Sequence, residues 1–206
     1  MHIAIAGNIG SGKTTLATML AKHYGWELQL EDMEDNPYIS DFYDDMQRWS
    51  FNLQVFFLHK RFSAIKKLRD EKITVVQDRS IYEDAQIFAP NLHAMGLMST
   101  RDFDNYMSLF NTLDAFLNQP DLMIYLRGSI PKLVDQIQKR GRDYEDSIRL
   151  DYLKRLNERY EAWAGAYKEK GGKIIYFNID DLDFANNKED ASKVIETIQA
   201  EINGLF

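Results

Sequence analysis

Short apolar runs alternate along the chain with longer segments whose apolar residues recur at helical spacing. Five of the runs have the length and composition of buried strands: Ile3–Ala6, Leu28–Leu30, Ile73–Gln77, Leu122–Leu126 and Lys173–Phe177. Strands that alternate with helices usually pair in parallel and need helices on both faces of the sheet. The pattern therefore predicts an α/β fold built on a five-stranded, mostly parallel sheet.

Four of the intervening segments predict long helices. Arg48–Arg69 has an almost continuous apolar middle, which is typical of a helix that is buried or lines a pocket. A capping box at Ser99 opens a helix that we expect to end at Asn118. Arg149–Lys170 precedes a pair of glycines, and Lys188–Asn203 is the last amphipathic segment. Because ligands of open α/β sheets bind beyond the carboxyl ends of the strands, polar residues at those ends are the first functional candidates.

Composition narrows the class of protein. The 206 residues are 45% hydrophobic and 28% charged, which suits a single globular domain, residues 1–206. A net charge of −7 argues against a nucleic acid polymer or an anionic membrane as partner, since both require a basic face. The absence of cysteine excludes disulfide and thiolate chemistry. No apolar run could span a bilayer and the first strand leaves no room for a signal peptide, so we expect a cytoplasmic protein.

A glycine-rich segment joins the first predicted strand to the first predicted helix. It matches G-x-x-x-x-G-K-[ST] at every fixed position, and its residues are Gly7, Asn8, Ile9, Gly10, Ser11, Gly12, Lys13, Thr14 and Thr15. The glycines allow backbone N–H groups to approach an anion closely, and a helix N-terminus favours negative charge. Lys13 adds a cation for the β- and γ-phosphates, and the Thr14 hydroxyl is a ligand for Mg²⁺. The segment predicts nucleotide binding rather than a chance glycine turn.

Charged residues follow the second and third predicted strands. Glu31 ends the second strand, where a carboxylate can accept the proton of a hydroxyl that attacks a phosphate. A solvated acidic loop is the alternative, because other acidic residues follow Glu31 closely. Asp78 ends the third strand and suits Mg²⁺, while Arg79 beside it can contact phosphate and carboxylate. A structural ion pair at the strand end is the alternative for this second group.

Two further groups of polar residues are candidates for ligand binding. Arg140 and Arg142 flank a glycine between two helices, which indicates either a lid that closes over phosphates or an ordinary helix C-terminus. Gln54 and Arg61 lie on one stripe of the apolar helix, and Asp84 is placed to meet Arg61. An amide with an Arg–Asp pair can recognise the polar edge of a base. A polar network inside the core is equally compatible with these residues.

Taken together, these motifs resemble the deoxynucleoside kinase family. The resemblance rests on the glycine-rich segment, on Asp78-Arg79-Ser80 and on Arg140-Gly141-Arg142 with Glu145. The stretch RWSFNLQ at 48–54 is similar to the branch that contains deoxyadenosine, deoxyguanosine and deoxycytidine kinases. The resemblance covers nearly the whole chain. It implies a three-layer P-loop kinase fold with a short arginine-bearing lid at about 136–148.

The resemblance also implies roles around the reacting groups. Glu31 matches the general base that activates the 5′-hydroxyl, and Arg79 matches the arginine beside that hydroxyl and the phosphoryl group. Tyr43 and Glu145 match the groups that hold the sugar 3′-hydroxyl. Asp78 stands where many relatives have the longer Glu, so the resemblance leaves open whether it contacts Mg²⁺ directly or through water.

A second set of residues matches the base pocket of the family. Gln54 matches the amide that pairs with the base, and Arg61 with Asp84 matches the pair that lines the pocket. We also expect Phe57, on the same helix as Gln54, to contact the substrate. The lid departs from that of some relatives, since Gln136 occupies the position of a third arginine, which implies a weaker hold on phosphate.

The expected reaction is transfer of a phosphoryl group from ATP, with Mg²⁺, to the 5′-hydroxyl of a 2′-deoxynucleoside, as in nucleotide salvage. The P-loop segment with Arg140 and Arg142 is expected to bind ATP, and Lys13 with Arg79 to neutralise charge on the transferring group. Deoxyadenosine is favoured over deoxyguanosine and deoxycytidine. Relatives imply a homodimer through helices such as Thr100–Asn118.

Three alternatives remain open. A nucleoside-monophosphate kinase of the thymidylate type would use Arg61 to hold the acceptor phosphate. A GTP-driven switch is disfavoured because the D-x-x-G element is missing and the only N-K-x-D-like letters follow the last strand at the wrong spacing. A nucleotide sensor without catalysis would bind ATP but show no turnover that depends on an acceptor.

Overall fold

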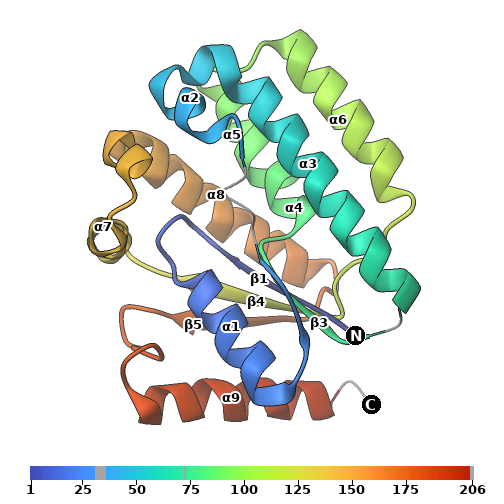
Figure 1. The fold of residues 1–206 in the computed structure, drawn as a ribbon, viewed down its shortest axis with the longest axis vertical. Helices are drawn as coiled ribbons and strands as arrows, with labels where there is room; N and C mark the ends of the chain where they lie inside the picture. Colours follow the sequence, from blue (N-terminus) through green and yellow to red (C-terminus); the bar gives the residue numbers. More distant parts are fainter. Residues whose placement is uncertain (31–35, 72, 205–206) are drawn as a thin grey trace.

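A single parallel sheet organises the computed structural model, which describes residues 1–30, 36–71 and 73–204 (Figure 1). The five strands lie in the order β2-β3-β1-β4-β5. They are β1 (His2–Gly7), β2 (Glu27–Gln29), β3 (Val75–Asp78), β4 (Leu122–Arg127) and β5 (Ile174–Asn178). Every predicted run falls on one of these strands with small shifts at its ends, so the prediction of a five-stranded parallel sheet is confirmed.

Helices cover both faces of the sheet and complete three layers. The helical elements are α1 (Lys13–Tyr24), α2 (Ile39–Asp44), α3 (Met46–Glu71), α4 (Ile81–Glu83), the π-helix η1 (Asp84–Phe88), α5 (Ala89–Ala94), α6 (Thr100–Asp114), α7 (Ile130–Arg140), the 3-10 helix η2 (Asp143–Ser147), α8 (Leu150–Glu169) and α9 (Lys188–Asn203). In Figure 1, α1 and α9 lie on one side of the sheet, and α3, α4 and α8 lie on the other, with α6 outside α3. None of the described helices is long and apolar enough to cross a membrane.

Side chains of the buried strands point alternately to the two faces of the sheet, so each face has its own hydrophobic core. Ile3 and Ile5 of β1 pack with the α1 and α9 side, whereas Ala4 and Ala6 pack with the α3 and α8 side. Successive side chains of a strand point to opposite faces, so a central strand must be apolar throughout to serve both cores. The continuous apolar run that predicted β1 therefore reflects its position at the centre of the sheet.

The long helices agree with the predicted pattern except at one end. Ser99 accepts a hydrogen bond from the Asp102 N–H at 3.1 Å, which confirms the predicted start of α6. The prediction that this helix ends at Asn118 is wrong, because α6 ends at Asp114. There the backbone changes to shorter-range bonds, from Phe116 N to Leu113 O at 3.0 Å and from Leu117 N to Asp114 O at 2.9 Å. Such i to i−3 bonds tighten the chain and end the α-helical repeat.

Candidate active site

The P-loop crosses from the central strand β1 to the N-terminus of α1 in a conformation that requires glycine. Gly10 and Gly12 have φ values of 83° and 86°, in the left-handed region. A Cβ on Gly10 would lie 2.7 Å from the Leu133 carbonyl oxygen, and one on Gly7 would lie 2.5 Å from Ser11 Oγ. A side chain at Gly7 or Gly10 would therefore disrupt close contacts of the loop with its surroundings.

Two side chains shape the interior of the loop. Lys13 is buried and its ammonium donates to the Asn8 carbonyl oxygen at 2.9 Å, so the cation lies against the loop. The Asn8 side chain accepts from Ile9 N at 2.8 Å and donates to the Leu153 carbonyl oxygen at 3.0 Å, which ties the loop to α8. Thr15, in contrast, is exposed and does not line the cavity described below. Its side chain therefore contributes little to the interior of the loop.

Thr14 and Asp78 bring two oxygen ligands together from different elements. The Thr14 hydroxyl donates to Asp78 Oδ2 at 2.5 Å. Asp78 Oδ1 is buried without a hydrogen-bond partner among the described residues. The described chain contains no group of three or more His, Cys, Asp and Glu side chains able to hold a metal. This small set of oxygens fits Mg²⁺, which proteins bind through one or two carboxylates together with substrate phosphates.

A cavity of about 480 Å³ opens beside the P-loop, beyond the carboxyl ends of β1 and β3. Its volume is that of a site for a small molecule. The predicted site residues that line it are Ile9, Gly10, Lys13, Thr14, Tyr43, Gln54, Phe57, Asp78, Arg79, Asp84, Arg140, Arg142 and Glu145. Leu30 also lines it, but the predicted base Glu31 lies outside the described residues. The fold therefore gathers most of the predicted site into one cavity.

Three of the predicted base-binding residues, Gln54, Phe57 and Asp84, line the cavity. Gln54 is 2% exposed, and its Oε1 has no hydrogen-bond partner within the described part of the chain. Arg61 and Asp84 form a buried ion pair, and the Arg61 guanidinium lies 4.6 Å from the centre of the Phe57 ring. Arg61 does not line the cavity itself, whereas Asp84 does. The pair is therefore brought together as predicted, with Asp84 in the wall of this cavity and Arg61 in the wall of a smaller one that shares Phe57 and Arg79 with it.

The predicted sugar-binding residue Glu145 contacts both arginines of the predicted lid. Arg140 Nε donates to Glu145 Oε2 at 3.0 Å, and Arg142 lies 3.6 Å from Glu145 Oε1. Arg140 ends α7, and Gly141 follows it in the left-handed conformation at φ 63°, so the two arginines flank the glycine at which the helix ends. Tyr43 stacks on Tyr144 with ring centres 5.8 Å apart. The pKa of Tyr43 is well above its ordinary value, mainly through burial, so its hydroxyl keeps a proton to donate.

Arg79 adopts a backbone conformation that is rare for a residue with a side chain. Its φ is 66°, and its N–H donates to the Ile5 carbonyl oxygen at 3.0 Å. The guanidinium lies 4.6 Å from the centre of the Phe88 ring, donates to the Tyr160 hydroxyl, and lies 3.5 Å from Glu83. Sequence reasoning missed both of these last partners. The S-x-x-E spacing from Ser80 is a capping-box pattern that would have singled out Glu83.

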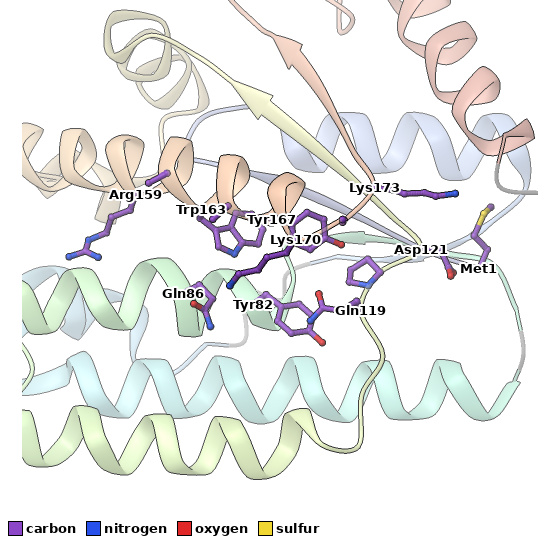
Figure 2. Close-up of a pocket in the computed structure, with 15 residues that line it drawn as sticks. Met1, Tyr82, Gln86, Gln119, Asp121, Arg159, Trp163, Tyr167, Lys170 and Lys173 are labelled. Carbon is purple, nitrogen blue, oxygen red and sulfur yellow. The ribbon is translucent and has the colours of Figure 1, made fainter.

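A second, larger cavity of about 1130 Å³ lies at the opposite end of the sheet (Figure 2). Its wall includes Met1, which precedes β1, and Lys173, which precedes β5. Figure 2 shows Tyr82 and Gln86 facing Trp163 across it. It contains none of the predicted site residues. Because ligands of parallel sheets bind at the carboxyl ends of the strands, the smaller cavity is the candidate active site.

A phosphate-binding loop on the central strand, facing a cavity of nucleoside size, is the arrangement of a P-loop kinase. The chain belongs to the deoxynucleoside kinase family, whose sequence model matches residues 3–203. The resemblance noted from the sequence is thereby confirmed, and with it the expectation of a phosphotransferase that acts on deoxynucleosides.

Known proteins resemble the chain over most of its length. The deoxyadenosine/deoxycytidine kinase of Bacillus subtilis (strain 168) is 37% identical over 204 residues, which cover 98% of this chain and 93% of the relative. The deoxyguanosine kinase of the same organism is 34% identical over 194 residues, covering 93% of each chain. The structure of deoxyadenosine kinase from M. mycoides with bound dATP superposes with a TM-score of 0.84 at 28% identity, covering 97% of this chain and 99% of that one.

Proposed function

We propose that the protein transfers the γ-phosphoryl group of ATP to the 5′-hydroxyl of a 2′-deoxynucleoside and prefers deoxyadenosine. The observation that carries the proposal is the buried Gln54 Oε1, an acceptor without a partner among the described residues, in the cavity that also contains Lys13. Adenine and cytosine offer an amino donor to such an acceptor, as when a Gln amide pairs with adenine. The deoxyadenosine kinase of M. mycoides, which binds dATP and dCTP, supports the same group of bases.

The proposed mechanism assigns the groups around the sugar and the transferring phosphoryl group to residues of this cavity. Tyr43 and Glu145 hold the sugar 3′-hydroxyl, which directs the 5′-hydroxyl toward Lys13 and Arg79. Glu31 accepts the hydroxyl proton, a role that rests on the sequence because this residue lies outside the described part. Each arginine or lysine that faces the transferring group stabilises the charge that spreads over its oxygens.

The remaining site residues bind ATP, the phosphoryl donor. Thr14 and Asp78 would hold Mg²⁺, which, when bound, neutralises charge on the phosphates of ATP. Arg140 and Arg142 belong to a lid at about 136–148 that closes over the phosphates and excludes water, so that the nucleoside rather than solvent is phosphorylated. The contacts of both arginines with Glu145 support the proposal, since they bring the lid cations next to the sugar site.

A substrate panel tests the preference. The purified protein is assayed with ATP and Mg²⁺ against the four deoxynucleosides and against dAMP. We expect deoxyadenosine to show the highest kcat/KM, deoxycytidine to follow, and dAMP to remain unphosphorylated. Faster turnover of dAMP would instead establish a nucleoside-monophosphate kinase. A higher kcat/KM for deoxyguanosine than for deoxyadenosine would overturn the proposed preference while leaving the kinase activity intact.

The monophosphate kinase has little support from the site. It requires an arginine that faces the phosphate of the acceptor, and Arg61 was the candidate. Arg61 is buried and paired with Asp84, and of the two only Asp84 lines the cavity. Separating this pair would leave a buried carboxylate without its partner, at a cost of about 3–5 kcal/mol.

The role of Glu31 as the general base is tested by Glu31→Gln. Loss of the proton acceptor should lower kcat by roughly 10²–10⁴-fold while the KM for deoxyadenosine changes little. Near-normal turnover would remove Glu31 from the mechanism. A matched control is Glu27→Gln on β2, which is exposed and does not line the cavity.

We also propose that the chain is one domain that forms a homodimer in the cytoplasm, with small molecules as its only other partners. Support for the dimer comes from α6, where Leu109 is 41% exposed, and from Phe116 just beyond it, which is 65% exposed. Exposed apolar side chains of this size favour association. Light scattering tests the dimer, and Leu109→Lys with Phe116→Lys should yield a monomer if this surface forms the contact.

A further inference from the structure

Glu83 is buried at 0% exposure, and its carboxylate joins three parts of the site. Oε1 accepts from the Tyr160 hydroxyl at 2.8 Å and from Gly7 N at 3.4 Å, and lies 3.5 Å from Arg79 Nη1. Oε2 accepts from Ser80 N at 2.8 Å. One carboxylate thus contacts the start of the P-loop, the arginine after β3 and a tyrosine from the middle of α8.

Capping alone does not account for this arrangement. The capping box that opens α4 uses Oε2, through the N–H of Ser80. Such a cap is effective at the protein surface and needs no second oxygen. Burying a carboxylate is costly unless both oxygens are paired, and here Oε1 is directed at Tyr160 and Arg79. The second oxygen therefore serves something other than the helix start.

Arg79 is the group whose geometry depends on this oxygen. Its backbone is held in the left-handed region at φ 66°, which directs its side chain away from the path of a regular strand. Nη1 contacts both Tyr160 and Glu83, while Phe88 covers the face of the guanidinium. Two contacts on one nitrogen and a ring against one face define the plane in which the guanidinium fork lies.

We propose that Glu83 and Tyr160 are positioning residues that orient Arg79 toward the transferring phosphoryl group. This inference rests on the role proposed above for Arg79. The contact of Glu83 with Gly7 N links the same carboxylate to the loop that binds the phosphates, so the arginine and the loop keep a constant separation. Because a displacement of about 1 Å can cost roughly 100-fold in rate, losing either partner should lower kcat more than it raises KM.

Tyr160→Phe is the sharpest test, because the chain offers a matched control. Tyr125 is also buried and stacks on Tyr160 with ring centres 6.0 Å apart, but its hydroxyl donates to Glu161 at 2.9 Å. Each substitution to Phe removes one bonded hydroxyl from the same aromatic cluster. We expect Tyr160→Phe to lower kcat about tenfold with KM values for ATP and deoxyadenosine nearly unchanged. Tyr125→Phe should leave kcat as in the parent protein.

Glu83→Gln and Arg79→Ala separate the possible failures. Glu83→Gln keeps the shape and removes the charge, and it should lower kcat roughly 10- to 100-fold. If Arg79→Ala retains kcat, the role proposed for Arg79 is wrong. If Arg79→Ala loses kcat while Tyr160→Phe and Glu83→Gln retain it, Glu83 is only a helix cap and the positioning proposal fails.

A double variant completes the test and remains informative if Glu83→Gln folds poorly. When Tyr160 acts through Arg79, adding Tyr160→Phe to Arg79→Ala should cause no further loss of kcat. If the factors by which Tyr160→Phe and Arg79→Ala lower kcat multiply in the double variant, the proposal is contradicted. So would a kcat for Tyr160→Phe that equals that of Tyr125→Phe.

Discussion

The Thr14 hydroxyl lies 2.5 Å from Asp78 Oδ2, so the first turn of α1 and the end of β3 meet at a pair of oxygens. If these atoms hold Mg²⁺, Asp78→Asn weakens the metal site by removing its charge while keeping its shape. We expect the Mg²⁺ concentration for half-maximal activity to rise about tenfold or more. A titration of activity against Mg²⁺ measures it. Thr14→Ser keeps the hydroxyl and should resemble the parent, and an unchanged Mg²⁺ requirement in Asp78→Asn would exclude this carboxylate as a ligand.

We expect replacement of Gln54 to have opposite effects on stability and on substrate binding. Its Oε1 is buried without a described partner, and such a group costs about 1–3 kcal/mol in a folded protein. Gln54→Leu should therefore unfold at the same or a higher temperature. The kcat/KM for deoxyadenosine should fall roughly 10- to 100-fold, as expected for loss of an amide–base pair.

Gln77→Leu is the matched control for that substitution. Gln77 is also buried, but its Oε1 lies 2.7 Å from His2 Nε2. Its replacement should lower the unfolding temperature and leave kcat/KM unchanged. If the two variants behaved alike in both measurements, Gln54 would be an ordinary core residue.

Glycines in two parts of the fold should respond oppositely to alanine. At Gly10 the φ of 83° disfavours any side chain by about 1–2 kcal/mol, and the new Cβ would also meet the Leu133 carbonyl oxygen at 2.7 Å. Gly165 lies within α8, and a Cβ added there would have no described atom within 4 Å beyond the backbone of its own helix. Gly165→Ala should stabilise by up to about 1 kcal/mol. Thermal unfolding checks both, and Gly10→Ala should in addition lose ATP binding.

His2 makes the folding free energy depend on pH. Burial is the main reason that its pKa lies below the ordinary value of 6.5, while Gln77 and Asp121 partly oppose the shift. As the pH falls below that ordinary value, the unfolded chain binds a proton that the folded chain does not, so the free energy of unfolding decreases. At pH values above the pKa of His2 in the unfolded chain, neither state binds the proton, and His2 no longer lowers the free energy of unfolding.

The dependence is measured by urea unfolding at about pH 7.5 and about pH 5.5. In His2→Gln the difference between the two free energies of unfolding should shrink. His23→Gln, which replaces an exposed histidine, should leave the difference as it is in the parent. An equal difference in all three proteins would show that other groups cause the acid sensitivity.

The site residues that could be predicted from the sequence are those that belong to short contiguous motifs. The P-loop is contiguous, and Asp78 with Arg79 follows an apolar strand directly, so strand ends and motif spacing suffice to find them. The sheet order then brings β1 and β3 side by side, which explains why Thr14 and Asp78 meet. The end of α6 was predicted too late, because its last apolar residues continue the helical spacing after the backbone bonds have changed.

The sequence by itself determined the parallel α/β sheet, the phosphate loop and the membership of the deoxynucleoside kinase family. These follow from periodicity and from residues close together in the chain, which report directly on local backbone geometry. Only the tertiary structure decided that Tyr160 contacts both Arg79 and Glu83, and that Gln54 and Glu145 line the same cavity. Such contacts depend on how helices pack across the sheet, and a contact between Arg79 and Tyr160, 81 positions apart, leaves no pattern in the sequence.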